Sequence, residues 1–92
     1  MYYVYLLESI KDSSWYIGYT PDSPFKRLRK HNSGTEYYTK RKLPWRLVYF
    51  ESYLNRTDVT CREKFLKSGA GRNFLKKQIK NYLSSANAVR TK

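Results

Sequence analysis

The stretch "WYIGYT", residues 15–20, combines aromatic and β-branched residues with a single glycine. Residues of this kind favour a β-strand. A similar stretch, "YYVYLL" at residues 2–7, precedes it, and the polar segment "ESIKDSS" between them has the length of a hairpin connection. The two stretches therefore predict an antiparallel hairpin, from which the rest of the architecture follows.

The register of this hairpin decides which side chains share a face. A turn centred between residues 10 and 11 places Tyr5 opposite Tyr16 and Tyr3 opposite Gly18. Directly opposed residues project from the same face of a sheet. We therefore expect these four positions on one face, and a shift of one residue would move them to different faces.

The remaining elements complete the order ββαβαα. A capping Asp22 or Ser23 and a glycine exit at Gly34 bound a helix at about residues 24–33. A third strand, "WRLVYFESYL", and two helices follow, at residues 45–54, 58–69 and 73–85. We predict an α+β fold with a three-stranded antiparallel sheet flanked by helices, in one domain at residues 1–83 with a flexible tail at residues 84–92.

The first of these helices has two distinct sides. Phe25 and Leu28 are three residues apart and are expected to face the core. Arg27 and His31 are four apart, so they stack together on a different side. Arg27 is either a solvated helix charge or a functional cation, and His31 is either a capping cation near the helix C-terminus or a catalytic group.

The second helix places a carboxylate beside an apolar stripe. At 100° per residue, Glu63 lies in the same narrow stripe as Val59 and Leu66. Glu63 can also pair with Lys67 at i+4, a common arrangement at helix surfaces. The apolar stripe argues against a purely solvated role for this glutamate.

Basic residues dominate the charge of the chain. Lys and Arg number 19 against 7 Asp and Glu, which gives a net charge of +12 in 92 residues. Such an excess attracts polyanions through counterion release, so we expect a nucleic-acid partner. The sequence has no run of 18 apolar residues, and no basic helix has a continuous apolar face. We expect a soluble cytoplasmic protein without a membrane partner, present as a monomer or a weak dimer.

Cysteine and histidine each occur once. A single cysteine excludes an internal disulfide, and one histidine with one cysteine cannot form a Cys/His metal cluster. Any metal ion must therefore be held mainly by oxygen ligands.

Four motifs occur in a recognisable order: "VYL" at 4–6, "YIG" at 16–18, "RLRKH" at 27–31 and "REKFLKSG" at 62–69. From about Tyr2 to Leu83 the chain resembles the small, single-domain bacterial members of the GIY-YIG nuclease superfamily. The resemblance implies a metal-dependent DNA endonuclease that acts on branched or damaged DNA, as in DNA repair, with low sequence specificity. Tyr3 stands where the first triplet of the family has glycine.

The resemblance also implies roles for individual residues. Tyr5 would help to deprotonate the attacking water, and Tyr16 would hold the phosphate or the water network. Gly18 would keep the strand surface open. Because the ordinary pKa of tyrosine is about 10, Tyr5 requires nearby cations to stabilise its phenolate.

Arg27 matches the arginine of the family, which would clamp the developing negative charge. Glu63 matches the metal-binding glutamate, expected to hold one Mg²⁺ or Mn²⁺ that also touches the scissile phosphate. His31 would act as a phosphate ligand or proton relay.

A further group of basic side chains is expected to follow the nucleic-acid backbone. Its members are Lys30, Lys40, Arg41, Lys42, Arg62, Lys67 and Arg72. The alternative to a nuclease is a weakly active or inactive nucleic-acid-binding module on the same fold. An RNA-binding accessory protein ranks last, since no RNA-recognition signature is visible, although RNA is not excluded as a partner.

Overall fold

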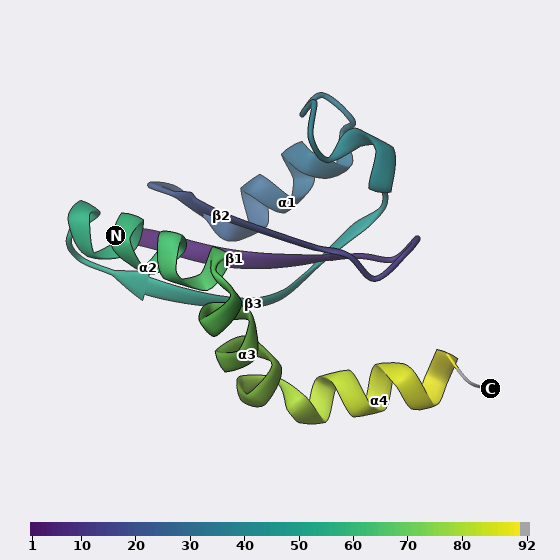
Figure 1. The fold of residues 1–92 in the computed structure, drawn as a ribbon. Coiled ribbons are helices and arrows are strands. Elements are labelled where there is room, and N and C mark those ends of the chain that lie inside the picture. The colour runs from purple at the N-terminus through teal and green to yellow at the C-terminus, as the bar shows by residue number, and fades with distance from the viewer. Residues whose placement is uncertain (91–92) are drawn as a thin grey trace.

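The computed structural model describes the backbone of residues 1–90 and the side chains of residues 1–85. The elements are β1 (Tyr2–Ser9), β2 (Trp15–Thr20), α1 (Pro24–Asn32), the short 3₁₀ helix η1 (Lys40–Lys42), β3 (Trp45–Tyr53), α2 (Arg56–Lys67), α3 (Gly69–Gln78) and α4 (Lys80–Arg90) (Figure 1). The three strands form one antiparallel sheet in the order β2-β1-β3. The expected α+β class and the three-stranded sheet are confirmed.

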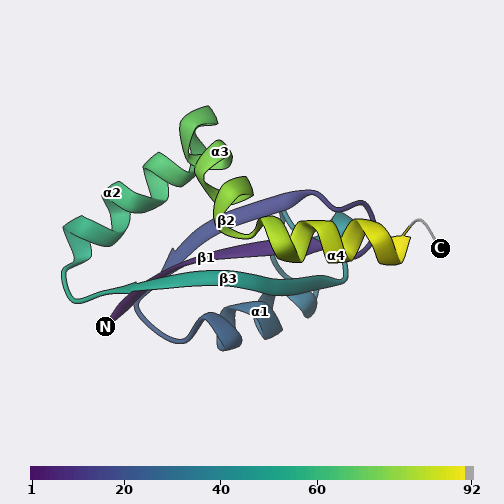
Figure 2. The ribbon, with the colours of Figure 1, turned by 90° about the horizontal axis from the view of Figure 1, so that it is seen from below.

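Helices cover both faces of the sheet. Helix α1 lies on one face, and α2 and α3 lie on the other (Figure 2). Each face has its own apolar core. The core under α2 and α3 contains Val4, Leu6, Ile17, Val59, Leu66 and Leu75, and the core under α1 contains Tyr5, Leu7 and Trp45.

The hairpin register differs from the expected one by two residues. Tyr5 is paired with Gly18 and Tyr16 with Leu7, so the pairing of Tyr5 with Tyr16 is wrong. The turn is centred one residue later and includes Ser13 at φ 66°. Because side chains alternate with a period of two, a shift of two residues preserves the faces. Tyr5, Tyr16 and Gly18 therefore lie on one face, as expected.

Helix α1 begins and ends as its sequence indicates. The Ser23 hydroxyl accepts a hydrogen bond from the Phe25 amide, and Gly34 adopts φ 81° after the helix. Leu28 packs into the α1 core, but Phe25 is 55% exposed. Phe25 lies in the first turn, where its ring contacts Phe50 of the edge strand β3 instead of the core.

The C-terminal region contains two helices where one was expected. Helix α3 begins at Gly69, because the Ser68 side chain caps it by accepting from the Gly71 amide. The helix ends before Ile79, at φ −113° and ψ 29°, and α4 follows. Helix α4 includes residues 84–90 of the expected tail, whereas residues 91–92 lie outside the described residues. No helix in the described part of the chain is long and apolar enough to cross a membrane.

Candidate active site

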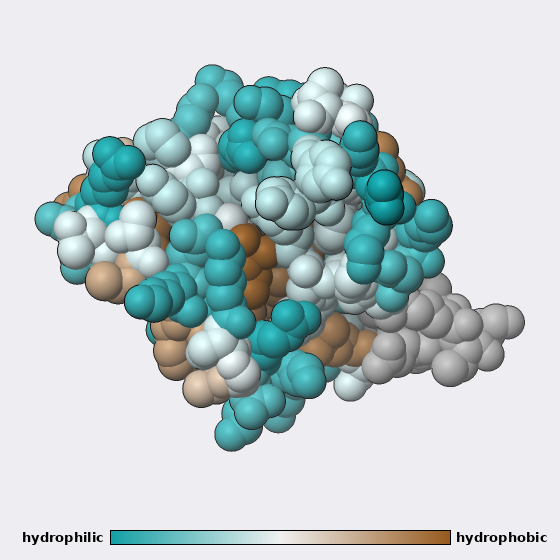
Figure 3. Space-filling view, turned by 45° about the horizontal axis from the view of Figure 1, so that its top comes forward, coloured by the Kyte–Doolittle hydropathy of each residue, from teal (hydrophilic) through white to brown (hydrophobic). Residues whose placement is uncertain are grey.

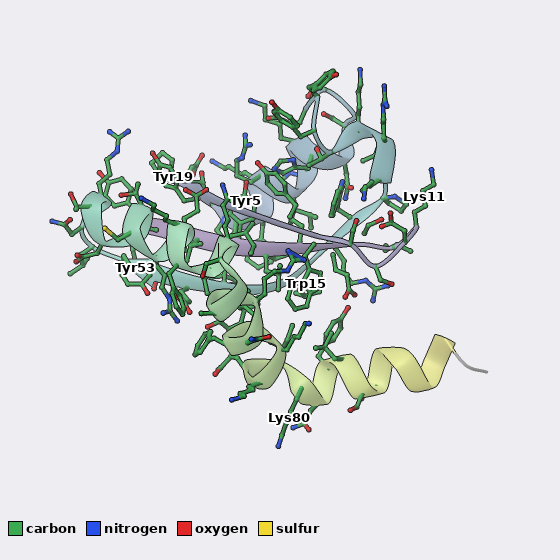
Figure 4. The ribbon with its side chains drawn as sticks, viewed as in Figure 1. Tyr5, Lys11, Trp15, Tyr19, Tyr53 and Lys80 are labelled. Carbon is green, nitrogen blue, oxygen red and sulfur yellow. The ribbon has the colours of Figure 1, made fainter. Side chains whose placement is uncertain are left out.

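The hydroxyl of Tyr5 lies in a buried polar cluster on the α1 face of the sheet. Tyr5 is 2% exposed, and its Oη lies 3.1 Å from Nε2 of His31. Nε of Arg27 donates to the same oxygen at 3.4 Å. Figure 4 labels Tyr5 among the side chains on the side of the sheet that α1 covers. Arg27 and His31, one turn apart on α1, thus both contact the hydroxyl of Tyr5 on β1.

The donor-only chemistry of arginine fixes the direction of these hydrogen bonds. A terminal nitrogen of Arg27 lies 3.5 Å from Nε2 of His31, and a guanidinium can only donate. Nε2 therefore carries the lone pair, and Nδ1 carries the proton, which it donates to Oγ1 of Thr39 at 2.9 Å. Tyr5 accepts from Arg27, and its hydroxyl at 3.1 Å, closer than the Arg27 nitrogen at 3.5 Å, is the main donor to the single lone pair of His31 Nε2. The result is a directional chain from Arg27 through Tyr5 and His31 to Thr39.

Burial keeps both titratable members of this chain neutral. Burial raises the pKa of Tyr5, and the opposing hydrogen bond and charge of Arg27 do not compensate for it. The phenolate that neighbouring cations were expected to stabilise is therefore not the resting form. Burial and the charge of Arg27 lower the pKa of His31. His31 is an uncharged acceptor bonded to side chains, not a capping cation.

Gly18 and Tyr16 complete the arrangement on β2. A Cβ at position 18 would lie 2.6 Å from Oη and 2.8 Å from Cζ of Tyr5, so only glycine leaves room for the Tyr5 ring. The Tyr16 ring lies 4.9 Å from the ring of His31 and 6.4 Å from that of Tyr5, between centroids. The structure thus brings together Tyr5, Tyr16, Arg27 and His31.

Two residues of this cluster carry no signal in the sequence. Thr39 is 1% exposed and fixes the His31 ring. Oε1 of Glu36 lies 3.2 Å from Arg27 and 3.7 Å from Lys30. Both belong to the polar loop after α1 and reach the site only because that loop folds back over the helix. Their types and spacing match no motif that would have revealed them.

Glu63 belongs to α2, whose apolar stripe at Val59 and Leu66 packs on the sheet. Helix α2 packs against β1 and β2 on the face opposite α1. The Glu63 side chain is 20% exposed, and its carboxylate lies 3.2 Å from Nζ of Lys67, so the i+4 pair is present. Among the described residues, no hydrogen bond or ion pair joins Glu63 to the Tyr5 cluster.

The available donors fit only one kind of metal site. Within the described residues, no group of three or more His, Cys, Asp and Glu side chains could hold a metal ion. Mg²⁺ commonly retains several waters and binds through one or two carboxylates together with substrate phosphates. The half-buried Glu63 carboxylate fits this second arrangement as a single protein ligand.

The basic residues expected to contact nucleic acid differ in their surroundings. Lys40, Arg41 and Lys42 form η1 and are exposed. The Arg72 guanidinium lies 5.5 Å from the centre of the Trp15 ring. Hydrophilic residues predominate on the face seen in Figure 3, and apolar residues form separate patches there. The surface around η1 is thus suited to an anionic partner.

Arg62 is held in a structural network. Its guanidinium donates to both carboxylate oxygens of Glu51, at 2.8 and 3.0 Å, and lies over the rings of Phe65 and Phe74. The hydroxyls of Tyr49 and Tyr53 also donate to Glu51. This geometry favours a structural role for Arg62 over the expected phosphate contact, whereas the roles of the other basic residues stay predictions.

The fold and the site define a small α+β domain with groups suited to phosphodiester hydrolysis: a tyrosine hydroxyl bonded to a histidine, a half-buried arginine and a separate carboxylate. Residues 1–78 match the family model of the GIY-YIG catalytic domain, and the chain belongs to this family. The resemblance of the four motifs is thereby confirmed.

Relatives of known sequence agree with this assignment. The chain is 41% identical over 66 residues to a UPF0213 protein of Streptococcus pneumoniae, covering 71% of this chain and 65% of that protein. It is 41% identical over 68 residues to a UPF0213 protein of Clostridium perfringens, covering 73% and 71%. The structure-specific endonuclease subunit SLX1 of Scheffersomyces stipitis is 54% identical over 54 residues, which cover 51% of this chain and 16% of that subunit. The match thus spans slightly less than two thirds of the Streptococcus protein and a small part of SLX1.

Proposed function

We propose that the chain is a metal-dependent endonuclease that hydrolyses one phosphodiester bond in branched or damaged DNA with low sequence specificity. The observation that carries the proposal is the directional chain at Tyr5, whose hydroxyl proton has a neutral acceptor, His31 Nε2, at 3.1 Å. Membership in the GIY-YIG family and the similarity to a structure-specific endonuclease subunit support the same chemistry.

The proton of the attacking water leaves through this chain. The water gives its proton to Oη of Tyr5 while Tyr5 gives its own proton to Nε2 of His31. The water oxygen then forms the new bond to phosphorus, and the bond to the leaving strand breaks with its electron pair. His31 becomes a cation beside Arg27, and the Glu36 carboxylate at 3.2 Å from Arg27 offsets that repulsion.

The other site residues act on the phosphate. Arg27 neutralises the charge that develops on the phosphate oxygens. Tyr16 lies beside the His31 ring and holds the phosphate or its waters. Glu63 would hold Mg²⁺ or Mn²⁺, and such an ion would supply positive charge to neutralise the phosphate.

We infer a nucleic-acid partner from the net charge of +12 and from the exposed basic residues of η1, which attract a polyanion. We further propose that the protein works in the cytoplasm as a monomer or weak dimer, without a membrane partner. DNA is the proposed substrate. The cleavage assay described next includes an RNA, so that cleavage of the two nucleic acids can be compared.

A nicking assay tests the proposal. Supercoiled, single-stranded and branched DNA and a single-stranded RNA are incubated with the protein in Mg²⁺, in Mn²⁺ and in EDTA. We expect DNA cleavage in either metal, none in EDTA, and a loss of at least about 100-fold in Glu63→Gln and Arg27→Ala. Cleavage by Glu63→Gln at the wild-type rate would refute the metal role.

The second candidate is a nucleic-acid-binding module with little or no turnover on the same fold. It is favoured by the pairing of Glu63, whose carboxylate among the described residues bonds to Lys67 at 3.2 Å and to no member of the Tyr5 cluster. Tight binding of every DNA by the wild type, with no cleavage in either metal, would establish this alternative.

A further inference from the structure

Two adjacent tyrosines project from the loop after α1. Tyr37 is 68% exposed and Tyr38 is 84% exposed. Their rings meet edge to face with centroids 5.4 Å apart. Nζ of Lys40 lies 5.3 Å from the centre of the Tyr37 ring. The pair therefore presents aromatic faces to solvent beside a cation, and it contributes little to either core.

The residues directly before and after the exposed tyrosine pair both bond to residues of the active site. Glu36 precedes it and binds Arg27 at 3.2 Å, and Thr39 follows it and binds His31 at 2.9 Å. The amides of Thr39 and Lys40 donate to the Glu36 carbonyl, so the segment forms a closed turn. Consecutive Cα atoms are about 3.8 Å apart, so each exposed ring lies within two residues of a group bonded to the site. The backbone that carries the two rings is thus anchored to the site that contains Tyr5.

We propose that Tyr37 and Tyr38 form a stacking platform for unpaired nucleobases of the strand that the active site cuts. This inference rests on the proposed function. It narrows the substrate of the proposed nuclease to nucleic acid with a single-stranded segment next to the scissile phosphate. Bases stack on exposed aromatic rings without regard to sequence, and basic residues guide the backbone past them. Lys40, Arg41 and Lys42 follow the pair directly and supply those charges.

Paired bases cannot use such a platform, because both of their faces are covered within the duplex. A strand advances about 3.4 Å per stacked nucleotide, so a base on this pair belongs to a nucleotide within a few positions of the phosphate at Tyr5. The neighbouring charge also favours a polyanion over an apolar protein surface as the occupant.

Binding without metal tests the proposal apart from cleavage. Dissociation constants are measured in EDTA at one salt concentration, by anisotropy of labelled oligonucleotides: a DNA strand, its duplex and the RNA of the same sequence. We expect Tyr37→Ala/Tyr38→Ala to weaken single-strand binding by about tenfold or more and duplex binding by less than about twofold. If the loss is greater on the DNA strand, the platform serves DNA, and if it is greater on the RNA, it serves RNA.

Two variants serve as controls. Tyr37→Phe/Tyr38→Trp retains the rings and should bind single strands as the wild type does. Leu54→Ala truncates an apolar side chain that is 83% exposed after β3, and should change nothing. Equal losses on strand and duplex, or no loss on the strands, would overturn the inference. Because no cleavage is measured, a protein that never cuts DNA would still give a decisive answer.

Discussion

Tyr5 and Gly18 face each other across β1 and β2, and the missing side chain of Gly18 is what allows the Tyr5 hydroxyl to reach His31. The hydroxyl oxygen occupies the space next to the glycine, 2.6 Å from where a Cβ would lie. The glycine of the "YIG" triplet therefore has a steric function in this chain. It also links the strand pairing directly to the proposed proton transfer.

The first prediction concerns Gly18→Ala. Alanine in a strand is ordinarily more stable than glycine by about 0.5–1 kcal/mol. Here the new methyl group displaces the Tyr5 ring, so we expect a loss of about 1–3 kcal/mol in unfolding free energy. Cleavage should fall by at least about 100-fold, because the relay through Tyr5 is broken. Urea denaturation and single-turnover cleavage measure the two effects.

Gly69→Ala is the matched control, because a Cβ there meets no atom within 4 Å. It should leave both quantities near the wild-type values. A Gly18→Ala protein with greater stability and full activity would contradict the steric account.

The second prediction concerns His31 and the dependence of stability on pH. The pKa of His31 is lowered from 6.5 in the folded protein, mainly by burial and then by Arg27. Between the folded pKa and 6.5 the unfolded chain binds a proton that the folded chain does not bind, so stability falls as the pH falls through this window. Urea denaturation between about pH 7 and pH 5 should show this loss in the wild type.

His31→Gln removes the titrating group and should flatten that slope. Glu51 does not obscure the comparison, because its pKa is lowered from 4.5 and its own stabilisation is lost only at more acid pH. The account fails if the wild type and His31→Gln lose stability equally across the window.

The sequence predicts most of the fold, because the strongest signals are periodic. The face shared by Tyr5, Tyr16 and Gly18 survives a two-residue error in register, since the side-chain period of a strand is two. The start of α3 was not predictable in the same way. The expected helices were separated by residues 70–72, whereas the Ser68 side chain caps a helix that already begins at Gly69.

The site is predictable only where residues share an element or a motif. Arg27 and His31 lie one turn apart on α1, so helical spacing brings them together. Thr39 joins them through the path of a loop, which depends on tertiary contacts such as the bond from Nε1 of Trp45 to the Thr39 carbonyl. The metal role of Glu63 stays a prediction, because helical periodicity places it in the stripe of Val59 and Leu66 but does not indicate which face of the sheet α2 covers.

The third prediction assigns a positioning role to Thr39. Thr39→Val keeps the shape of the side chain but removes the acceptor for Nδ1–H of His31. That acceptor stabilises the protonated ring more than the neutral ring, so its loss lowers the pKa of His31 further. We expect cleavage to fall by about 10- to 100-fold and the acid limb of the pH–rate profile to move to lower pH.

Thr39→Ser retains the hydroxyl and should restore both the rate and the position of the acid limb. A purely structural residue would reduce the rate without moving the limb. A Thr39→Val profile that is lower but unshifted would therefore exclude the positioning role.

The last prediction separates Arg62 from the exposed basic residues. Removal of Arg62 leaves the partly buried Glu51 carboxylate without its bidentate cation, so Arg62→Ala should cost about 2 kcal/mol of unfolding free energy. Arg41 is exposed on η1, so Arg41→Ala should leave stability unchanged. It should instead reduce the slope of log K against log salt concentration for DNA binding by about one. Arg62→Ala should leave this salt dependence of DNA binding unchanged. If Arg62→Ala is instead as stable as the wild type and has a reduced slope, Arg62 contacts the phosphate backbone.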